Sequence, residues 1–248
     1  KTEESNSKIC KMCKGTFWIM NSDSNTAIRC ECYKRERQER RLRFATIPKA
    51  FEGVTLRTFK KSVYKLPESL NTIEIAMKAI KYYIDNFKAL QEQGKGLYIS
   101  SGTKGSGKTR LAISIANKRL EEHQVKFATS STIIEEIKKT YHEKSEYTES
   151  KLIDDLINTE ILIIDDFGAE KYTEWKDDRF YLIINERYIN KKVTIYTSNY
   201  ALDNLVYDER IINRIKEQAF QLQFPEESVR EHIAEQNANE LIINTAQF

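Results

Sequence analysis

The stretch GLYISSGTKGSGKT, residues 96–109, decides the fold of this chain. Within it, residues 102–109 fit the Walker A pattern G-x-x-x-x-G-K-[ST], in which glycines let backbone N–H groups turn around a polyphosphate. Lys108 would reach the terminal phosphates, and the hydroxyl of Thr109 would hold Mg²⁺. The pattern therefore predicts a nucleotide site made of Gly102, Thr103, Lys104, Gly105, Ser106, Gly107, Lys108 and Thr109.

The residues on both sides of this loop have the character that the motif requires. Residues 96–101 form an apolar run typical of a short buried strand, and 108–123 carry apolar residues at helical spacing. The loop would then end at a helix N-terminus, whose free N–H groups and dipole favour an anion. A glycine-rich turn with an exposed lysine is the alternative, and the later motifs count against it.

The composition is that of a soluble globular protein. Of the 248 residues 40% are hydrophobic, and no apolar run approaches the roughly 20 residues of a membrane span. The net charge of +3 is too near zero to indicate nucleic-acid binding by itself. The chain begins with Lys1 and shows no signal-peptide pattern, so we expect a cytoplasmic protein that was processed or is preceded by further residues.

All four cysteines lie near the start of the chain in two close pairs. Cys10 and Cys13 form C-x2-C, and Cys30 and Cys32 form C-x-C. Two such pairs match a structural zinc site with four cysteine ligands, and residues 16–20 and 26–29 could form a hairpin between them. Redox-active or adventitious thiols are the alternative.

A charged segment follows the cysteines. Residues 29–43 carry seven Lys and Arg side chains against three glutamates, which predicts a charged helix leaving the zinc module. This helix is either a solvated linker or a surface for nucleic acid or another partner. Pro48 breaks it, and the segment up to Phe59 is irregular. We expect an N-terminal module over 1–46 and an ATPase domain over 47–248.

Apolar spacing predicts the remaining elements of the second domain. Helices are expected over 70–93, 131–141, 150–158, 175–190 and 208–216, with Ser131 or Thr132 as the N-cap of the second and Ser228 capping a last helix. Strands are expected over 125–129, 161–165, 193–197 and, at a sheet edge, 220–224. Together with 96–101 they make an α/β fold with a five-stranded parallel sheet flanked by helices.

Polar residues that suit nucleotide chemistry stand at the ends of two of these strands. In ILIIDD, four apolar residues precede Asp165 and Asp166, as in a buried parallel strand whose C-terminal end faces a ligand. Asp165 would hold Mg²⁺, largely through water, and Asp166 would polarise the attacking water. Asn199 could reach the γ-phosphate and that water, or could serve only the turn.

Three arginines follow in the C-terminal part of the chain. Arg210 and Arg214 lie one helical turn apart, and Arg230 falls in the first turn of the last helix. Because a cation at a helix N-terminus opposes the helix dipole, a phosphate partner for Arg230 is a reasonable alternative to a plain surface position.

These motifs, in this order, give residues 47–235 a resemblance to AAA+ ATPases, and more closely to the DnaC/DnaI type of bacterial and phage helicase loaders. The closer likeness rests on the DDFGAE run at 165–170, the IPKAF lead-in at 47–51 and the N-terminal cysteines. The resemblance implies Walker B at Asp165 and Asp166, sensor I at Asn199, an arginine finger at Arg214 or its competitor Arg210, and sensor II at Arg230. Since the chain is short after Pro225, we expect a reduced or absent C-terminal lid.

The resemblance also implies a function. Such proteins load a hexameric DnaB-type replicative helicase onto single-stranded DNA by Mg²⁺-dependent ATP hydrolysis, which assembly stimulates because the arginine finger acts on a neighbouring subunit. The zinc module would hold the helicase, and Lys138, Lys139 and Tyr141 would contact DNA. A transposition helper ATPase of the IstB type, and an adaptor that ATP switches with little turnover, are the alternatives. No membrane partner is expected.

Overall fold

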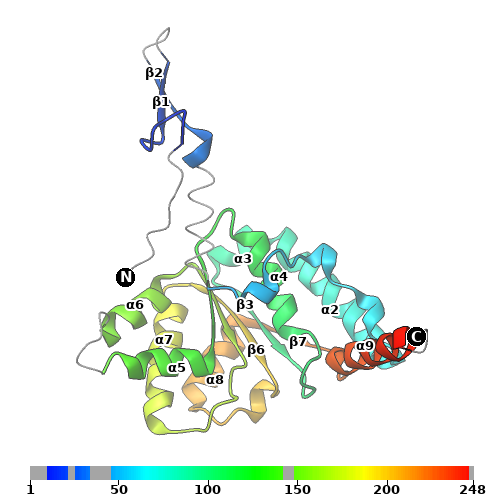
Figure 1. Cartoon of the computed structure of the whole chain (residues 1–248). Helices are drawn as coiled ribbons and strands as arrows, with labels where there is room; N and C mark the ends of the chain where they lie inside the picture. Colours follow the sequence, from blue (N-terminus) through cyan, green and yellow to red (C-terminus); the bar gives the residue numbers. More distant parts are fainter. Residues whose placement is uncertain (1–9, 22–25, 34–45, 142–147, 246–248) are drawn as a thin grey trace.

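The computed structural model describes residues 10–21, 26–33, 46–141 and 148–245 (Figure 1). Five strands form one parallel sheet. Their spatial order is β4 (Val125–Thr129), β5 (Ile161–Asp165), β6 (Val193–Ser198), β3 (Gly96–Ser100) and β7 (Ala219–Gln223). The expected five-stranded parallel sheet is therefore confirmed, with the last strand at an edge.

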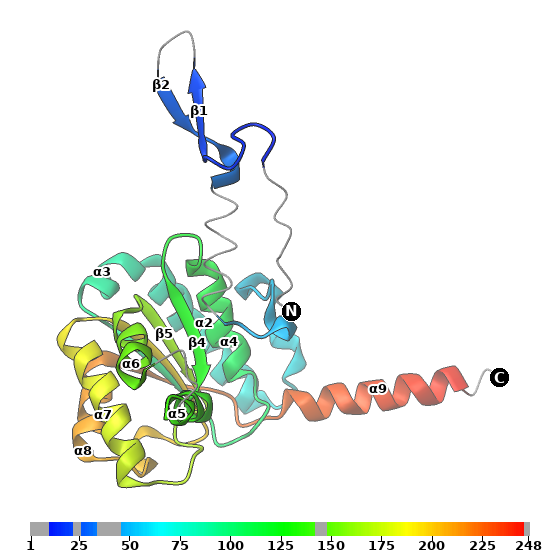
Figure 2. The same ribbon diagram turned by 60° about the vertical axis from the view of Figure 1, so that its left-hand side comes forward.

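Helices cover both faces of this sheet (Figures 1 and 2). One face carries α2 (Pro67–Asp85), α3 (Phe87–Glu92) and α4 (Lys108–Arg119). The other carries α5 (Ser130–Lys139), α6 (Glu149–Asn158), α7 (Glu174–Ile189) and α8 (Glu209–Gln218). Short 3-10 turns are η1 (Lys49–Phe51), η2 (Leu56–Thr58), η3 (Lys61–Val63) and η4 (Leu202–Asn204). Helix α9 (Val229–Thr245) follows β7 and extends away from the sheet in Figure 2.

The inner strand β5 shows why the sequence forms this layered fold. Its side chains alternate between the two faces, so Ile161 and Ile163 enter one core while Leu162 and Ile164 enter the other. A strand buried on both faces reads as a continuous apolar run. The strand register then places polar residues together. Asp165 pairs with Thr129, and Ser100 pairs with Ser198, all at the C-terminal ends of the parallel strands, where such sheets bind ligands.

Two expectations about helices are wrong in detail. The helix expected over 70–93 begins at Pro67 and is interrupted at Asn86, whose side-chain amide donates to the carbonyl oxygen of Tyr82 at 2.9 Å. The backbone of Asn86, with ψ +15°, leaves the helical conformation and separates α2 from α3. The N-cap of α5 is Thr129, since its hydroxyl accepts from the amide of Thr132 at 3.0 Å, and not Ser131 or Thr132 themselves.

The N-terminal segment forms the expected hairpin. Strands β1 (Trp18–Asn21) and β2 (Thr26–Arg29) pair antiparallel, with Trp18 opposite Arg29. Residues 34–45 lie outside the described residues. They include most of the predicted charged helix, and they adjoin the predicted domain boundary at residue 46. Within the described ranges, no helix has both the length and the apolar character needed to cross a bilayer.

Candidate nucleotide site

A pocket of about 490 Å³ lies where the loop after β3 faces the ends of β5 and β6. It brings together most of the predicted site residues from distant parts of the chain. Those that line it are Lys104, Gly105, Ser106, Gly107, Lys108, Thr109, Asp166, Asn199 and Arg230. Gly102 and Thr103, at the start of the loop, are not among the lining residues.

The loop has the backbone that its glycines predict. Gly107 has φ +102°, and a Cβ atom there would lie 3.1 Å from the hydroxyl of Tyr64. That hydroxyl donates to the carbonyl oxygen of Ser106 at 2.6 Å, and burial raises the pKa of Tyr64. Tyr64 supports the loop from 42 residues away, and no motif in the sequence indicated this contact.

Lys108 begins α4 and lies folded into its own loop. Its Nζ donates to the carbonyl oxygens of Ser101 at 3.0 Å and Thr103 at 2.9 Å. Burial lowers the pKa of Lys108, and the charges of Asp166, Glu226 and Asp165 oppose that shift. A phosphate entering the pocket would offer this ammonium a charged acceptor in place of two neutral carbonyls.

The oxygens of Thr109 and Asp165 form a pair suited to a hard cation. Thr109 Oγ1 donates to Asp165 Oδ2 at 3.1 Å, and the Asp165 side chain is buried. Burial raises the pKa of Asp165, and the hydrogen bond from Thr197 opposes the shift. A hydroxyl and a carboxylate side by side are ligands that Mg²⁺ accepts, so the residues present fit that ion.

Thr197 holds both candidate aspartates, and sequence reasoning did not assign it this role. Its buried hydroxyl donates to Asp165 Oδ1 at 2.5 Å and accepts from the amide of Asp166 at 3.0 Å. Asp166 has φ +52°, a conformation that is uncommon for a residue with a side chain. The Ser130 hydroxyl at 2.9 Å and the Ala169 amide at 3.1 Å donate to the Asp166 carbonyl oxygen. The sequence signal was a threonine near the end of a buried strand, one of three Ser and Thr residues in Val193–Ser198.

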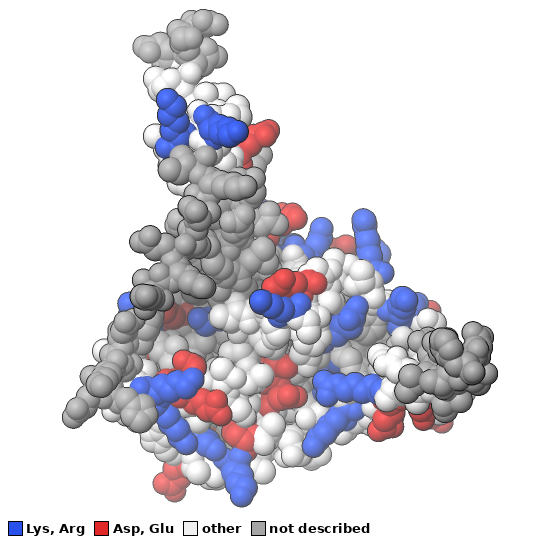
Figure 3. All heavy atoms as spheres, in the orientation of Figure 1, with Lys and Arg blue, Asp and Glu red and all other residues white. Residues whose placement is uncertain are grey.

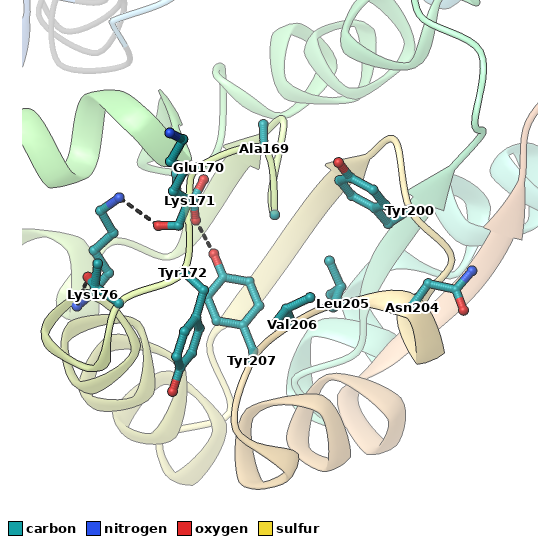
Figure 4. Close-up of a pocket in the computed structure, with 12 residues that line it drawn as sticks. Ala169, Glu170, Lys171, Tyr172, Lys176, Tyr200, Asn204, Leu205, Val206 and Tyr207 are labelled. Atoms are coloured by element: carbon teal, nitrogen blue, oxygen red, sulfur yellow. Dashed lines mark hydrogen bonds between the residues drawn. The ribbon is translucent and has the colours of Figure 1, made fainter.

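A second cavity, of about 310 Å³, lies behind the loop that carries Asp166 (Figure 4). Ala169 lines both cavities, so this loop forms a wall that they share. Glu170 points to the hydroxyl of Tyr207, which donates to it. Its other carboxylate oxygen lies 2.5 Å from Ser130 Oγ, so Glu170 and the Asp166 carbonyl oxygen share the single proton of that hydroxyl. The Tyr207 ring stacks on Phe167 with ring centres 4.6 Å apart. These contacts anchor the loop on the side away from the nucleotide pocket.

The two candidate finger residues do not line the nucleotide pocket. Arg214 Nε donates to Asn185 Oδ1 at 2.7 Å, and its guanidinium lies 5.0 Å from the ring centre of Tyr181. Arg210 donates to both carboxylate oxygens of Asp208, at 2.9 and 3.0 Å. Both side chains are bound to their own chain on the surface of α8.

The four cysteines come together as predicted. The sulfur atoms of Cys10, Cys13, Cys30 and Cys32 all lie within 4.8 Å of one another. Zinc–sulfur bonds of about 2.3 Å in a tetrahedron require sulfur atoms roughly 3.8 Å apart. The Sγ atoms of Cys10 and Cys30 are separated by 3.8 Å and those of Cys13 and Cys32 by 3.3 Å, so four thiols grouped near this spacing fit zinc.

The strand, glycine loop and helix, together with paired aspartates at a neighbouring strand end, define a P-loop nucleotide-binding protein of the AAA+ class. The comparison with known families gives the particular group. Residues 31–236 match the family described as "IstB-like ATP binding protein", and the chain belongs to this family. The expected ATP-binding class is therefore confirmed.

Individual relatives agree with the expected resemblance. The chain is 29% identical over 141 residues to the replicative helicase loader DnaC of Buchnera aphidicola subsp. Baizongia pistaciae, a match covering 56% of each protein. The crystal structure of the DnaC helicase loader superposes with a TM-score of 0.58 at 26% identity, covering 72% of this chain and 100% of that one. DnaI superposes with a TM-score of 0.52 at 25% identity, covering 73% and 95%. The chain spans about half the length of the curated DnaC relatives it matches.

Proposed function

We propose that this protein uses ATP hydrolysis to load a DnaB-type replicative helicase onto single-stranded DNA. One observation carries the proposal. A nucleotide pocket with Lys108, Asp166, Asn199 and Arg230 around it lies in a fold whose relatives are named helicase loaders.

In this proposal each site residue has a distinct task. The amides of the loop and Lys108 bind the β- and γ-phosphates, and Arg230 reaches them from α9. Thr109 and Asp165 hold Mg²⁺, which when bound neutralises phosphate charge. Asp166 and Asn199 orient the water that attacks the γ-phosphate, because both face the pocket beyond the loop.

Full hydrolysis requires a second subunit. A finger arginine stabilises charge on the γ-phosphate and must enter the site. Since Arg214 lies outside the pocket of its own chain, it would serve the pocket of a neighbour. It would first have to release Asn185 and Tyr181, which makes turnover depend on assembly. Arg210, bound to Asp208, is the other candidate.

A cluster of aromatic and basic side chains supports a DNA contact. The rings of Tyr141 and Trp175 are 6.2 Å apart, and Lys138 Nζ lies 5.8 Å from the centre of the Trp175 ring. Arg179 covers the same ring at 4.6 Å. Aromatic faces beside cations suit stacked bases and a phosphate backbone. Lys139, by contrast, pairs with Glu136 at 2.6 Å.

The face drawn in Figure 3 favours such a local site over broad attraction. On the face drawn in Figure 3, Lys and Arg side chains alternate with Asp and Glu side chains. Mixed charge of this kind gives little long-range pull on nucleic acid. Recognition would therefore depend on the cluster beside Trp175.

The N-terminal residues 1–46 would form the module that holds the helicase. Zinc would stabilise its hairpin through the four cysteines. The exposed side chains of Met12, Met20 and Ile28 offer apolar contact area there. Because this module would be a separate domain joined to the ATPase near residue 46, it could stay bound to the helicase while the ATPase changes partners.

A transposition helper ATPase is the second candidate, because the matching family is described by the IstB name. Its natural partner would be a transposase. Capture from the native host with tagged wild type and with Lys108→Ala, with and without ATP, separates the two. The proposal expects a hexameric helicase to be recovered, and ATP to change its recovery with wild type only. A recovered transposase would overturn it.

A further inference from the structure

The connection between β7 and α9 encloses the start of the phosphate loop. Ser101 Oγ donates to the carbonyl oxygen of Pro225 at 2.9 Å, and the amide of Val229 donates to the carbonyl oxygen of Gly105 at 3.0 Å. A Cβ atom on Gly105 would lie 3.1 Å from the aliphatic carbons of Arg230. The segment that carries Arg230 is thus packed on the loop that would bind the phosphates.

Glu226, in the middle of this connection, makes the most specific contact. One oxygen of its carboxylate accepts from the amide of Gly102 at 2.8 Å, and the other accepts from the amide of Thr103 at 2.8 Å. Gln223 Nε2 donates to Oε1 of the same carboxylate at 3.1 Å. Partial burial opposes ionisation, but the two amides hold the pKa of Glu226 below its usual range.

We infer that Glu226 is a positioning residue for nucleotide binding, which acts by holding the first turn of the phosphate loop through the amides of Gly102 and Thr103. The inference rests on the proposed nucleotide site. Glu226 does not line the pocket, so it acts through the loop and not by touching the nucleotide.

The contacts of the Thr103 amide and carbonyl show how Glu226 could hold the loop. The amide of Thr103 is held by Glu226, while its carbonyl oxygen accepts from Lys108. When Lys108 turns to a phosphate, the carbonyl loses that partner, and the first turn keeps the Glu226 contacts and the bond from the Thr103 amide to Ser101 Oγ at 3.2 Å. A loop held in advance loses less conformational freedom on binding, which strengthens binding without changing the chemical step.

The test compares wild type with Glu226→Ala, Glu226→Gln and Glu226→Asp in the full chain. The matched control is Glu231→Gln, an exposed glutamate in the first turn of α9. We expect Glu226→Ala to raise the dissociation constant of a fluorescent ATP analogue by about tenfold, and its KM similarly, with kcat at saturation within about twofold. Glu226→Gln keeps one acceptor and should be intermediate, and Glu226→Asp should recover most of the affinity.

A second measurement does not depend on nucleotide. Hydrogen exchange of the Gly102 and Thr103 amides, followed by NMR in the nucleotide-free protein, should speed up by at least about tenfold in Glu226→Ala and stay unchanged in Glu231→Gln. If wild type bound no ATP, the proposed function would fail while this exchange still tested the contact. Unchanged exchange, or unchanged or tighter ATP binding in Glu226→Ala, would overturn the inference.

Discussion

At the scale of single residues, the site depends on a backbone conformation that side chains hold in place. Asp166 has φ +52°, and such a conformation costs on the order of 1 kcal/mol or more unless its surroundings fix it. The amide of Asp166 donates to the Thr197 hydroxyl, and the carbonyl oxygen of Asp166 accepts from the Ser130 hydroxyl. The candidate water-orienting carboxylate is therefore placed by residues from two neighbouring strand ends.

Replacing Thr197 tests this arrangement. Thr197→Val keeps the shape but leaves Asp165 Oδ1 and the Asp166 amide without this partner. We expect kcat to fall by about tenfold or more and the free energy of unfolding to fall by about 1–3 kcal/mol. Steady-state ATPase assays and denaturant unfolding check both. Thr197→Ser, which retains the hydroxyl, should recover most of the rate, and equal loss in both variants would contradict the role.

Asp166→Asn separates binding from hydrolysis. Asparagine tolerates a positive φ, so the backbone should be preserved while the carboxylate charge is lost. We expect nucleotide affinity to change little and stimulated hydrolysis to fall by about 100-fold or more. Equilibrium binding and phosphate release measure the two quantities. Asp178→Asn, on exposed α7 surface, is the control, and undiminished turnover in Asp166→Asn would remove that residue from the mechanism.

At the scale of elements, buried Glu227 joins the start of α2 to the start of α9. Its carboxylate accepts from the amides of Lys65 at 2.7 Å and Leu66 at 3.1 Å and lies 2.6 Å from His232 Nε2. Burial opposes ionisation, yet these bonds hold the pKa of Glu227 at about 2. The start of the helix that carries Arg230 is thereby tied to the segment after Tyr64, which itself contacts the loop.

The pH dependence of stability follows from this shift. A carboxyl group whose pKa is lowered on folding stabilises the protein above its unfolded pKa, and this contribution is lost as pH falls through the folded pKa. Glu227→Gln should therefore lower the free energy of unfolding by about 2 kcal/mol at pH 7. The difference should shrink as pH falls below about 4.5 toward 2. Urea unfolding from pH 7 to 3.5 checks this, with Glu231→Gln as control, and a difference independent of pH would contradict it.

At the scale of the whole molecule, the ATP site is incomplete without another copy if Arg214 acts in trans. Arg214→Ala and Lys108→Ala should each be nearly inactive alone. Mixed in equal amounts, about one interface in four would join an intact Lys108 to an intact Arg214 by random pairing. We expect ATPase activity to return toward that fraction. Absence of rescue, or rescue only when Arg210→Ala replaces Arg214→Ala, would move the finger role away from Arg214.

Metal removal tests the N-terminal module independently of the ATPase. The guanidinium of Arg29 lies 3.9 Å from the ring centre of Trp18, beside the four cysteines. In a Trp175→Phe background, chelation should change Trp18 fluorescence and release about one zinc ion per chain. ATP affinity should remain unchanged. Metal analysis that finds no zinc in freshly reduced wild type would contradict the site.

The sequence by itself determined the parallel sheet, the glycine loop, the aspartate pair and the cysteine pairs. It could do so because each of these features is indicated by residues close together in the sequence, as an apolar run, a helical periodicity or a short motif. The sequence also predicted Asp166 and Asn199 at this site, since parallel strands end at one edge, and both line the pocket. The break at Asn86 was missed, because the apolar spacing continues across it while the backbone of this one residue leaves the helical conformation.

Only the tertiary structure decided what holds the site together. Three contacts do this, and each joins residues 31 to 124 positions apart in the chain. They are those of Tyr64 with the loop, of Thr197 with the aspartates, and of Glu226 with the amides of Gly102 and Thr103. A threonine or a glutamate carries no local sign of such a partner, because hydrogen bonds of this kind depend on where the folded backbone brings two segments together. The physical reason is that the residues expected to bind the nucleotide occur in short local motifs. The residues that position them are determined by which distant segments the fold packs together.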